Sequence, residues 1–129
     1  MIPQCLDMGV GIIPWSPLAR GRLAGTRTRT GERRTTRAAT DAYAEELYSD
    51  ADFDVVDRLV EVARERGLPP AQVALAWLLH KPGVTAPIVG ATKPAHLDDA
   101  VTAVDVRLAD KEIARLEEPY RPHPVRGHE

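Results

Sequence analysis

The sequence predicts an α/β fold in which parallel strands alternate with helices and the sheet is incomplete. Two short runs, 10–15 and 84–89, are apolar on both faces, as strands buried in a parallel sheet are. Segments with helical periodicity follow each run, and strands that alternate with helices pair in parallel through crossovers. Two strands alone would leave both sheet edges unpaired. We therefore expect residues 1–129 to form a single incomplete domain, one section of a larger fold.

The composition is that of a globular protein of one domain. The chain has 129 residues, of which 43% are hydrophobic and 28% charged, and its net charge is −2. This charge gives no indication of a nucleic-acid or membrane partner, and no apolar run approaches the roughly 20 residues of a membrane span. Cys5 is the only cysteine, so the fold cannot depend on an internal disulfide, which fits a reducing cytoplasm. The four histidines have no paired metal-ligand spacing, so no metal site is expected.

The first two predicted elements are a helix end and a strand. Residues 1–8 have a partial apolar face, and Gly9 is expected to stop that helix. The strand Val10–Trp15 follows, and Pro14 removes one backbone donor close to its end.

A long basic loop is predicted at 19–50. Seven arginines lie between 20 and 37 and are followed by a run of acidic residues from Asp41. The loop has two interpretations, a solvated connection or a lid over a polyanionic ligand. It contains no aromatics between the arginines, which disfavours nucleic-acid binding.

Two helices are expected after this loop. The first spans about 51–66, is stopped by Gly67, and has inward-facing apolar residues at helical spacing. These are Phe53, Val56, Leu59, Val60 and Ala63. The second begins at Pro70, in the first-turn position that tolerates proline, and is apolar nearly all round to residue 79, so we expect Trp77 in the core.

The second strand, about Val84–Val89, is followed by two more helices. One is predicted over 94–104, with inward-facing apolar residues. They are Leu97, Val101 and Val104. The other is predicted near 110–118, with Ile113 and Leu116 as its apolar contacts, and 119–129 is expected to be an extended tail. Ala109 stands where Ser or Thr would complete a capping box with Glu112.

Each predicted strand leads directly into a turn. The first turn opens the arginine-rich stretch at 16–23, and the second, at 90–93, leads into a helix. If the strands are neighbours, the two turns meet at the same edge, and turns with free backbone N–H groups bind phosphate. The sequence therefore predicts a phosphate-binding edge.

Three runs in this order resemble the aldo-keto reductase family. They are WSPLARG at 15–21, PAQVALAWLL at 70–79 and IVGATKPAHL at 88–97. The resemblance covers essentially the whole chain. It implies a partial (β/α)8 TIM barrel, about the C-terminal half, with strands seven and eight and the C-terminal tail; a complete barrel needs about 250 residues.

The resemblance also implies an NADP(H) site. Trp15 matches the aromatic that stacks on the nicotinamide ring, and a further group matches the turn around the pyrophosphate. That group is Ser16, Pro17, Leu18 and Arg20. The turn around the adenosine 2′-phosphate is matched by Gly90, Ala91, Thr92 and Lys93. His96 stands where relatives commonly have Arg or Gln at that phosphate, and Asp99 where they have Glu near the adenine.

No segment matches the family's catalytic motifs, so no catalytic residue is assigned. The expected function is the cofactor-binding part of an enzyme that reduces aldehydes and ketones, inactive alone because the proton donor is absent. A small carbonyl substrate would bind only if an N-terminal half completed the fold. Two alternatives stay open: a split-enzyme subunit completed by a second chain, and a non-catalytic binding or interaction protein.

Overall fold

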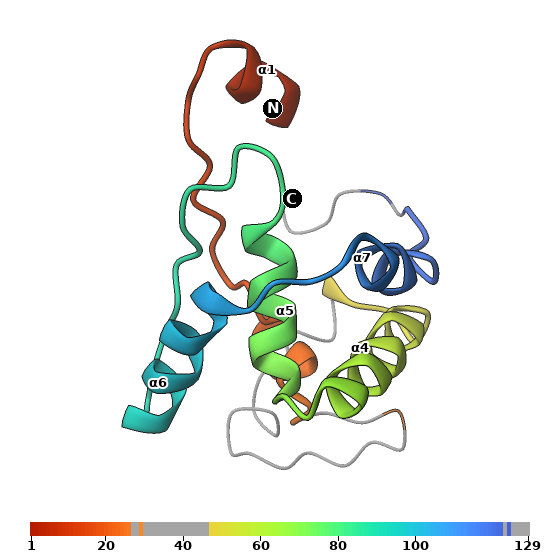
Figure 1. Cartoon of the computed structure of the whole chain (residues 1–129). Helices are drawn as coiled ribbons and strands as arrows, with labels where there is room; N and C mark the ends of the chain where they lie inside the picture. Colours follow the sequence, from red (N-terminus) through yellow and green to blue (C-terminus); the bar gives the residue numbers. More distant parts are fainter. Residues whose placement is uncertain (27–28, 30–46, 123, 125–129) are drawn as a thin grey trace.

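A computed structural model describes every residue of the chain except 27–28, 30–46, 123 and 125–129 (Figure 1). The described residues form a group of helices and two extended segments, which lie to one side of that group. The elements are α1 (Ile2–Asp7), the 3-10 helix η1 (Ala19–Ala24), α4 (Asp52–Arg66), α5 (Pro70–Leu79), α6 (Pro94–Thr102), the 3-10 helix η2 (Ala103–Asp105) and α7 (Asp110–Glu117).

The predicted ends of the central helices are confirmed. Helix α4 stops at Gly67, which has φ of +64°, a left-handed conformation that suits glycine. The N–H of Leu68 donates to the carbonyl of Ala63 at 3.0 Å, which closes the helix end. Helix α5 begins at Pro70 without a side-chain cap. A glycine stop and a proline start thus fix a three-residue connection, 67–69, between α4 and α5.

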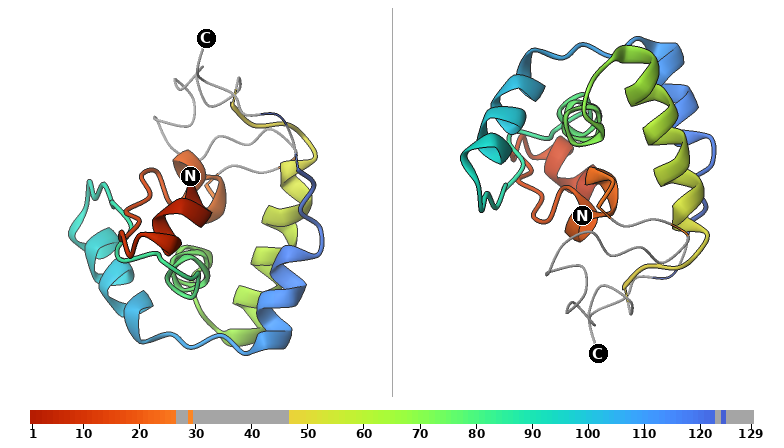
Figure 2. Two further views of the ribbon diagram at one scale, coloured as in Figure 1. Left: turned by 90° about the horizontal axis from the view of Figure 1, so that it is seen from above. Right: turned by 90° about the horizontal axis from the view of Figure 1, so that it is seen from below.

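Helix α5 lies at the centre of the helices. Viewed along its axis, it has α6 on one side and the pair α4 and α7 on the other (Figure 2). The core residues come from α4, α5, the segment after η2, and α7. They are Leu59, Val62, Ala63, Val73, Ala74, Ala76, Val106, Leu108 and Leu116. The core therefore belongs to the helices and not to the extended segments.

One prediction about the buried residues of these helices, that for Val60, is wrong, and the prediction for Trp77 is confirmed in part. Val60 is 42% exposed, whereas Val62 is fully buried at 0%. Helix α4 packs between α5 and α7 through the stripe that runs from residue 56 through 59 to 62 and 63, and Val60 lies beside that stripe. Trp77 packs against the core but is only partly buried, and its Nε1 donates to Glu117 at 2.9 Å.

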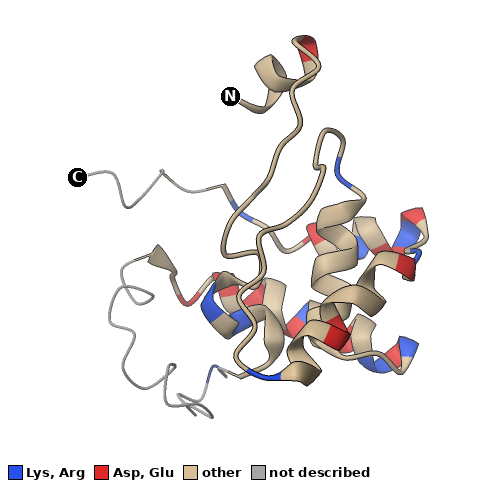
Figure 3. Cartoon of the chain, turned by 90° about the vertical axis from the view of Figure 1, so that its left-hand side faces the viewer, with Lys and Arg blue, Asp and Glu red and all other residues tan. Residues whose placement is uncertain are grey.

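The predicted parallel strands are present only as two isolated parallel bridges, Ile12 with Val84 and Trp15 with Ile88. No regular strand forms among the described residues, so the expectation of two full strands is wrong. Pro14 and Pro87 each remove a backbone donor, which breaks the ladder. The two segments nevertheless run side by side (Figure 3).

Gly11 allows the two extended segments to approach closely. A Cβ at this position would collide with Oγ1 of Thr85. The carbonyl of Ile12, the next residue, accepts from the N–H of Thr85 at 2.9 Å, and its N–H donates to the carbonyl of Gly83 at 2.8 Å. Lack of a side chain at residue 11 therefore permits this backbone pairing.

The apolar face expected on the helix at 94–104 is not buried. Leu97, Val101 and Val104 are 56%, 62% and 55% exposed, so their predicted inward orientation is wrong. Helix α6 contacts α5 through its other side, where Asp99 and Ala100 are half-buried. The helix ends at Thr102 and continues as η2.

Helix α7 follows its prediction, with Leu116 buried and Ile113 packed against the core. Its first turn has half of a capping box. Oε2 of Glu112 accepts from the N–H of Ala109 at 2.7 Å, while Ala109 has no side-chain oxygen to complete the reciprocal bond. Of the tail, only 119–122 and 124 lie within the described residues.

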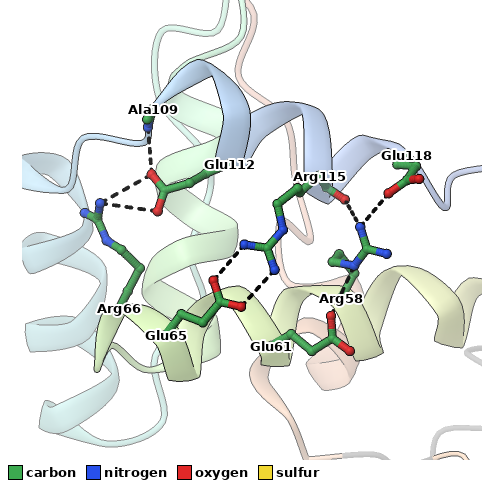
Figure 4. Close-up of polar contacts among 8 residues, drawn as sticks. All are labelled: Arg58, Glu61, Glu65, Arg66, Ala109, Glu112, Arg115 and Glu118. Atoms are coloured by element: carbon green, nitrogen blue, oxygen red, sulfur yellow. Dashed lines mark hydrogen bonds and ion pairs between the residues drawn. The ribbon is translucent and has the colours of Figure 1, made fainter.

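Ion pairs join α7 to α4 along their exposed side (Figure 4). Arg115 makes two bonds to Glu65 at 2.6 and 2.9 Å, and Arg58 donates to Glu118 at 2.7 Å. These guanidinium groups lower the pKa of both carboxyls below the ordinary value. The pairs are largely solvent-exposed, so each contributes little to stability.

The start of the predicted basic loop is ordered rather than irregular. Ala19–Ala24 form η1, and Arg22 is buried with its guanidinium over the rings of Tyr48 and Phe53, at 5.0 and 4.9 Å. A planar guanidinium stacks well on aromatic faces, so Arg22 belongs to the packing of this part of the chain. The rest of the loop prediction, lid included, lies mostly outside the described residues.

Candidate functional site

The two sequence-predicted turns leave the same end of the paired segments. Trp15 forms a parallel bridge with Ile88, so the two segments continue from this point in the same direction. Ser16 follows directly on one side, and Gly90 comes two residues after Ile88 on the other. Neither segment has a charged residue, from 8 to 19 in the first and from 84 to 92 in the second. The charges near this edge therefore come from the residues after each turn.

The first turn has an unusual backbone. Ser16, Ala19 and Arg20 have φ of 52°, 47° and 54°, although none of them is glycine. Such conformations cost of order 1–3 kcal/mol each and concentrate at binding sites. The N–H of Ala19 donates to the carbonyl of Ser16 at 3.0 Å, and that of Gly21 to Leu18 at 2.9 Å, which holds the turn in shape. Pro17 and Leu18, within the same turn, are half-buried.

Trp15 is the aromatic residue of this turn, and it is 66% exposed. A tryptophan that served only the core would be covered on both faces. The exposed indole is a large flat surface at the end of the paired segments, and such a surface can stack on a planar ring.

The second turn presents backbone donors and one cation. The backbone N–H groups of Ala91, Thr92 and Lys93 have no protein acceptor among the described residues. All three residues and Gly90 are exposed. Lys93 has no carboxylate partner within the part of the chain that the structure describes, and it immediately precedes α6. An anion at this turn would meet free N–H groups and an unpaired ammonium.

His96 lies one turn into α6, where it is exposed. Its Nδ1 is 3.5 Å from Oγ1 of Thr92, and its backbone N–H donates to the carbonyl of Lys93 at 3.0 Å. The structure therefore brings Thr92, Lys93 and His96 together around the start of the helix. Among the described residues, no hydrogen bond joins these three side chains to Trp15 or Ser16.

Asp99 is set apart from the other predicted residues. Its side chain is half-buried against α5, and its Oδ1 accepts from Nε2 of Gln72 at 2.9 Å. Sequence reasoning did not single out Gln72, which is only 6% exposed. The sequence feature that could have identified it is that Gln72 is the one polar residue in the otherwise apolar run 70–79.

The described residues include no group of three His, Cys, Asp or Glu side chains placed to hold a metal ion. Among those same residues, no helix has both the length and the apolar character needed to cross a bilayer.

Comparisons with known proteins give a consistent result. The family model described as "Aldo/keto reductase family" matches residues 1–121. A protein of Schizosaccharomyces pombe assigned as an aryl-alcohol dehydrogenase is 44% identical over 98% of this chain and 35% of its own length. The versiconal hemiacetal acetate reductase of Aspergillus parasiticus is also 44% identical, over 97% of this chain and 36% of its own length. An aldo-keto reductase of Fusarium vanettenii is 40% identical over 99% of this chain and 34% of its own length. The chain thus spans about a third of the length of these relatives.

Proposed function

Because the chain belongs to the aldo/keto reductase family, we propose that it is the C-terminal, NADP(H)-binding part of an oxidoreductase that reduces aldehydes or ketones to alcohols. The observation that supports this proposal best is the parallel bridge between Trp15 and Ile88. This bridge directs both turns to one edge, and phosphate groups in (β/α)8 barrels bind after the last two strands.

The residues divide into three roles along a dinucleotide. Trp15 would stack on the nicotinamide ring, and the strained turn would hold the pyrophosphate. The turn comprises Ser16, Pro17, Leu18 and Arg20. The second turn would bind the adenosine 2′-phosphate through its N–H groups, with Lys93 supplying a positive charge and His96 a further hydrogen-bonding group. Asp99 would lie near the adenine. Gly90, Ala91 and Thr92 form the backbone of that second turn.

The described geometry fits such a group. The flat, exposed indole of Trp15 suits the nicotinamide ring. The unpaired backbone N–H groups and the ammonium of Lys93 suit the phosphates. Bound NADPH supplies the hydride. The reduction also needs a proton donor at the carbonyl oxygen, and we assign that role to no residue of this chain, so turnover is expected to require the rest of a barrel.

The test is titration calorimetry with NADPH and NADH on the purified chain. NADPH is expected to bind more tightly, because only NADPH has the 2′-phosphate that Lys93 would contact. Lys93→Met should weaken NADPH binding by about fivefold, as an exposed ion pair is worth about 1 kcal/mol, and should leave NADH binding unchanged. Lys111→Met, which removes an exposed lysine on α7, is the matched control. Equal binding of both cofactors by wild type and Lys93→Met would contradict the assignment.

A second candidate function is that of a subunit completed by another polypeptide. Large apolar side chains on the paired segments are exposed. They are Val10, Ile13, Trp15 and Ile88, at 51%, 61%, 66% and 53%. A chain that supplied the remaining two-thirds of a barrel would cover them.

Co-expression with the other two-thirds of the Fusarium vanettenii relative tests this candidate. Copurification, with NADPH consumption on a panel of aldehydes, supports it. Carbonyl reduction by the chain alone would contradict both candidates. A partner that copurifies from the native source without any reductase activity would favour the third possibility, a non-catalytic interaction protein.

A further inference from the structure

The extended segment that contains Ile12 and Pro14 has one paired edge and one open edge. Backbone hydrogen bonds of 2.8 and 2.9 Å join these two residues to the neighbouring extended segment. The backbone groups of an extended chain alternate between its two edges. Gly11, Ile13 and Trp15 therefore direct their N–H groups and carbonyls to the opposite edge, which we call the open edge.

The backbone groups on the open edge are complete and unused. The N–H groups and carbonyls of Gly11, Ile13 and Trp15 make no hydrogen bond to any described residue, and all three residues are exposed. Pro14 lies on the paired edge, so the donor that proline lacks does not interrupt the open one. Such a row of free donors and acceptors is a template for pairing with another extended chain.

The open edge also lacks the charges that commonly protect exposed edges from such pairing. The sequence has no charged residue from 8 to 19. The side chains of Ile13 and Trp15 are apolar, and they are 61% and 66% exposed. Two copies of this edge would therefore meet without charge repulsion and would bury apolar surface.

The open edge is complementary to itself. In antiparallel pairing about a two-fold axis, each bonded residue must face one whose backbone groups also point outward. A register centred on Ile13 sets Ile13 opposite its own copy and Gly11 opposite Trp15, so each of these pairs can exchange two hydrogen bonds. A shift by two residues would set Trp15 opposite Gly9, whose φ of +66° is not extended, or Gly11 opposite Pro17, which has no N–H.

We propose that a second copy of this chain pairs with the open edge, antiparallel and centred on Ile13, to form a symmetric dimer. This inference goes beyond the proposed function, because the pairing needs neither a cofactor nor a completing chain. Three residues from each copy make a small interface, so the dimer is expected to be weak, with a dissociation constant of about 100 μM.

Sedimentation equilibrium of the purified chain from about 1 μM to about 1 mM tests the dimer. The mass of the wild type should rise from that of one chain to that of two. Ile13→Lys sets like charges opposite each other and removes both isoleucines from the interface, so it should weaken dimerisation about a hundredfold. Val101→Lys is the matched control, because Val101 is similarly exposed, at 62%, but lies on α6. This control should dimerise as the wild type does.

Disulfide crosslinking in a Cys5→Ser background tests the register. Directly opposed residues that exchange hydrogen bonds have Cα atoms about 5.5 Å apart, a separation that a disulfide can span. Ile13→Cys should therefore form a covalent dimer on mild oxidation at least about tenfold faster than Val101→Cys. This measurement replaces the mass comparison if circular dichroism shows that Ile13→Lys does not fold.

Several outcomes would overturn the proposal. They are a wild type that stays monomeric to about 1 mM, a mass that keeps rising beyond two chains, and a dimer that Val101→Lys disrupts while Ile13→Lys does not. Equal crosslinking rates at residues 13 and 101 would overturn the register. A monomeric wild type that copurifies with the other two-thirds of the Fusarium vanettenii relative would assign the open edge to a completing chain instead. NADPH binding is measured separately, so the proposed function stands or falls independently of these results.

Discussion

The position of Val62 allows a quantitative test of how α4 is oriented. Val62 is fully buried at 0% exposure, whereas Val60 on the same helix is 42% exposed. The perturbation is the same substitution at both sites, Val62→Ala and Val60→Ala. Because helix, residue type and replacement are identical, the difference between the two variants reports burial alone.

The magnitude follows from the methyl groups removed. Burial contributes about 0.8 kcal/mol for each group, or about 1.6 kcal/mol for the two that separate valine from alanine. The cavity left at Val62 adds to this loss, and the better helix propensity of alanine returns about 0.5 kcal/mol. We expect Val62→Ala to lower the free energy of unfolding by about 2 kcal/mol. Val60→Ala should change it by about 0.5 kcal/mol or less.

The assay is thermal and urea unfolding followed by circular dichroism at 222 nm. For a chain of this length, about 2 kcal/mol corresponds to a melting temperature lower by about 8 °C. Urea m-values should be equal in wild type and both variants, since the surface exposed on unfolding is unchanged. If Val60→Ala proves as destabilising as Val62→Ala, or more so, the assigned buried face of α4 is wrong.

Three further predictions concern a helix end, an ion pair and a close approach. Gly67→Ala should destabilise by about 1 kcal/mol in urea unfolding, because its φ of +64° is costly for a residue with a Cβ. The pKa of Glu65 is lowered by Arg115 from about 4.5, so the stability from this pair is present above that pH and lost as the pH falls through the depressed pKa. Glu65→Gln should therefore flatten the dependence of unfolding free energy on pH below about 4.5. Gly11→Ala should destabilise through collision with Thr85, and Thr85→Ala in the same chain should restore part of the loss.

Each of these has its own control. Gly90→Ala is matched to Gly67→Ala, since Gly90 has open space and no positive φ; a similar loss in both would contradict the backbone argument. For the pH dependence, Asp110→Asn changes a carboxylate for which no ion pair is recorded within the described part of the chain and should leave the profile as in wild type. For Gly11, equal stability of the single and double variants would show that Thr85 is not the obstacle.

The sequence was sufficient to place the helices because their ends depend on local chemistry. Gly67 and Pro70 mark a stop and a start through their own backbone preferences, so no knowledge of neighbours was needed. The choice between Val60 and Val62 could not be made in the same way. Both valines lie on or next to the apolar stripe of α4. The angle at which α5 and α7 pack against α4 decides which of the two is covered.

The errors on α6 and on the extended segments have one physical origin. Leu97, Val101 and Val104 have the spacing of a buried face, yet they are exposed, because periodicity shows that a face is apolar but not whether a partner is present. The strand composition of 10–15 likewise presupposes neighbouring strands. Among the described residues these segments pair only with each other, and both contain a proline, so they form two isolated bridges.

For the candidate site, the sequence indicated the residues of both turns but not how they are supported. The positive φ values of Ser16, Ala19 and Arg20 have no signature in residue type, since none is glycine. The contact of Gln72 with Asp99 joins residues on separate helices, and no local pattern pairs them. Only the packing of α5 on α6 shows the connection.

The attachment of Arg29 has a consequence for how this chain can vary. Arg29 donates to both Asp54 and Asp57 at the beginning of α4, while Ser49 donates to Asp52 beside them. The stretch between Arg29 and Ser49 thus starts and finishes at one place on the scaffold. Because both contacts are made to the first turns of α4, a change in the number of residues between Arg29 and Ser49 should leave the start of this helix in place.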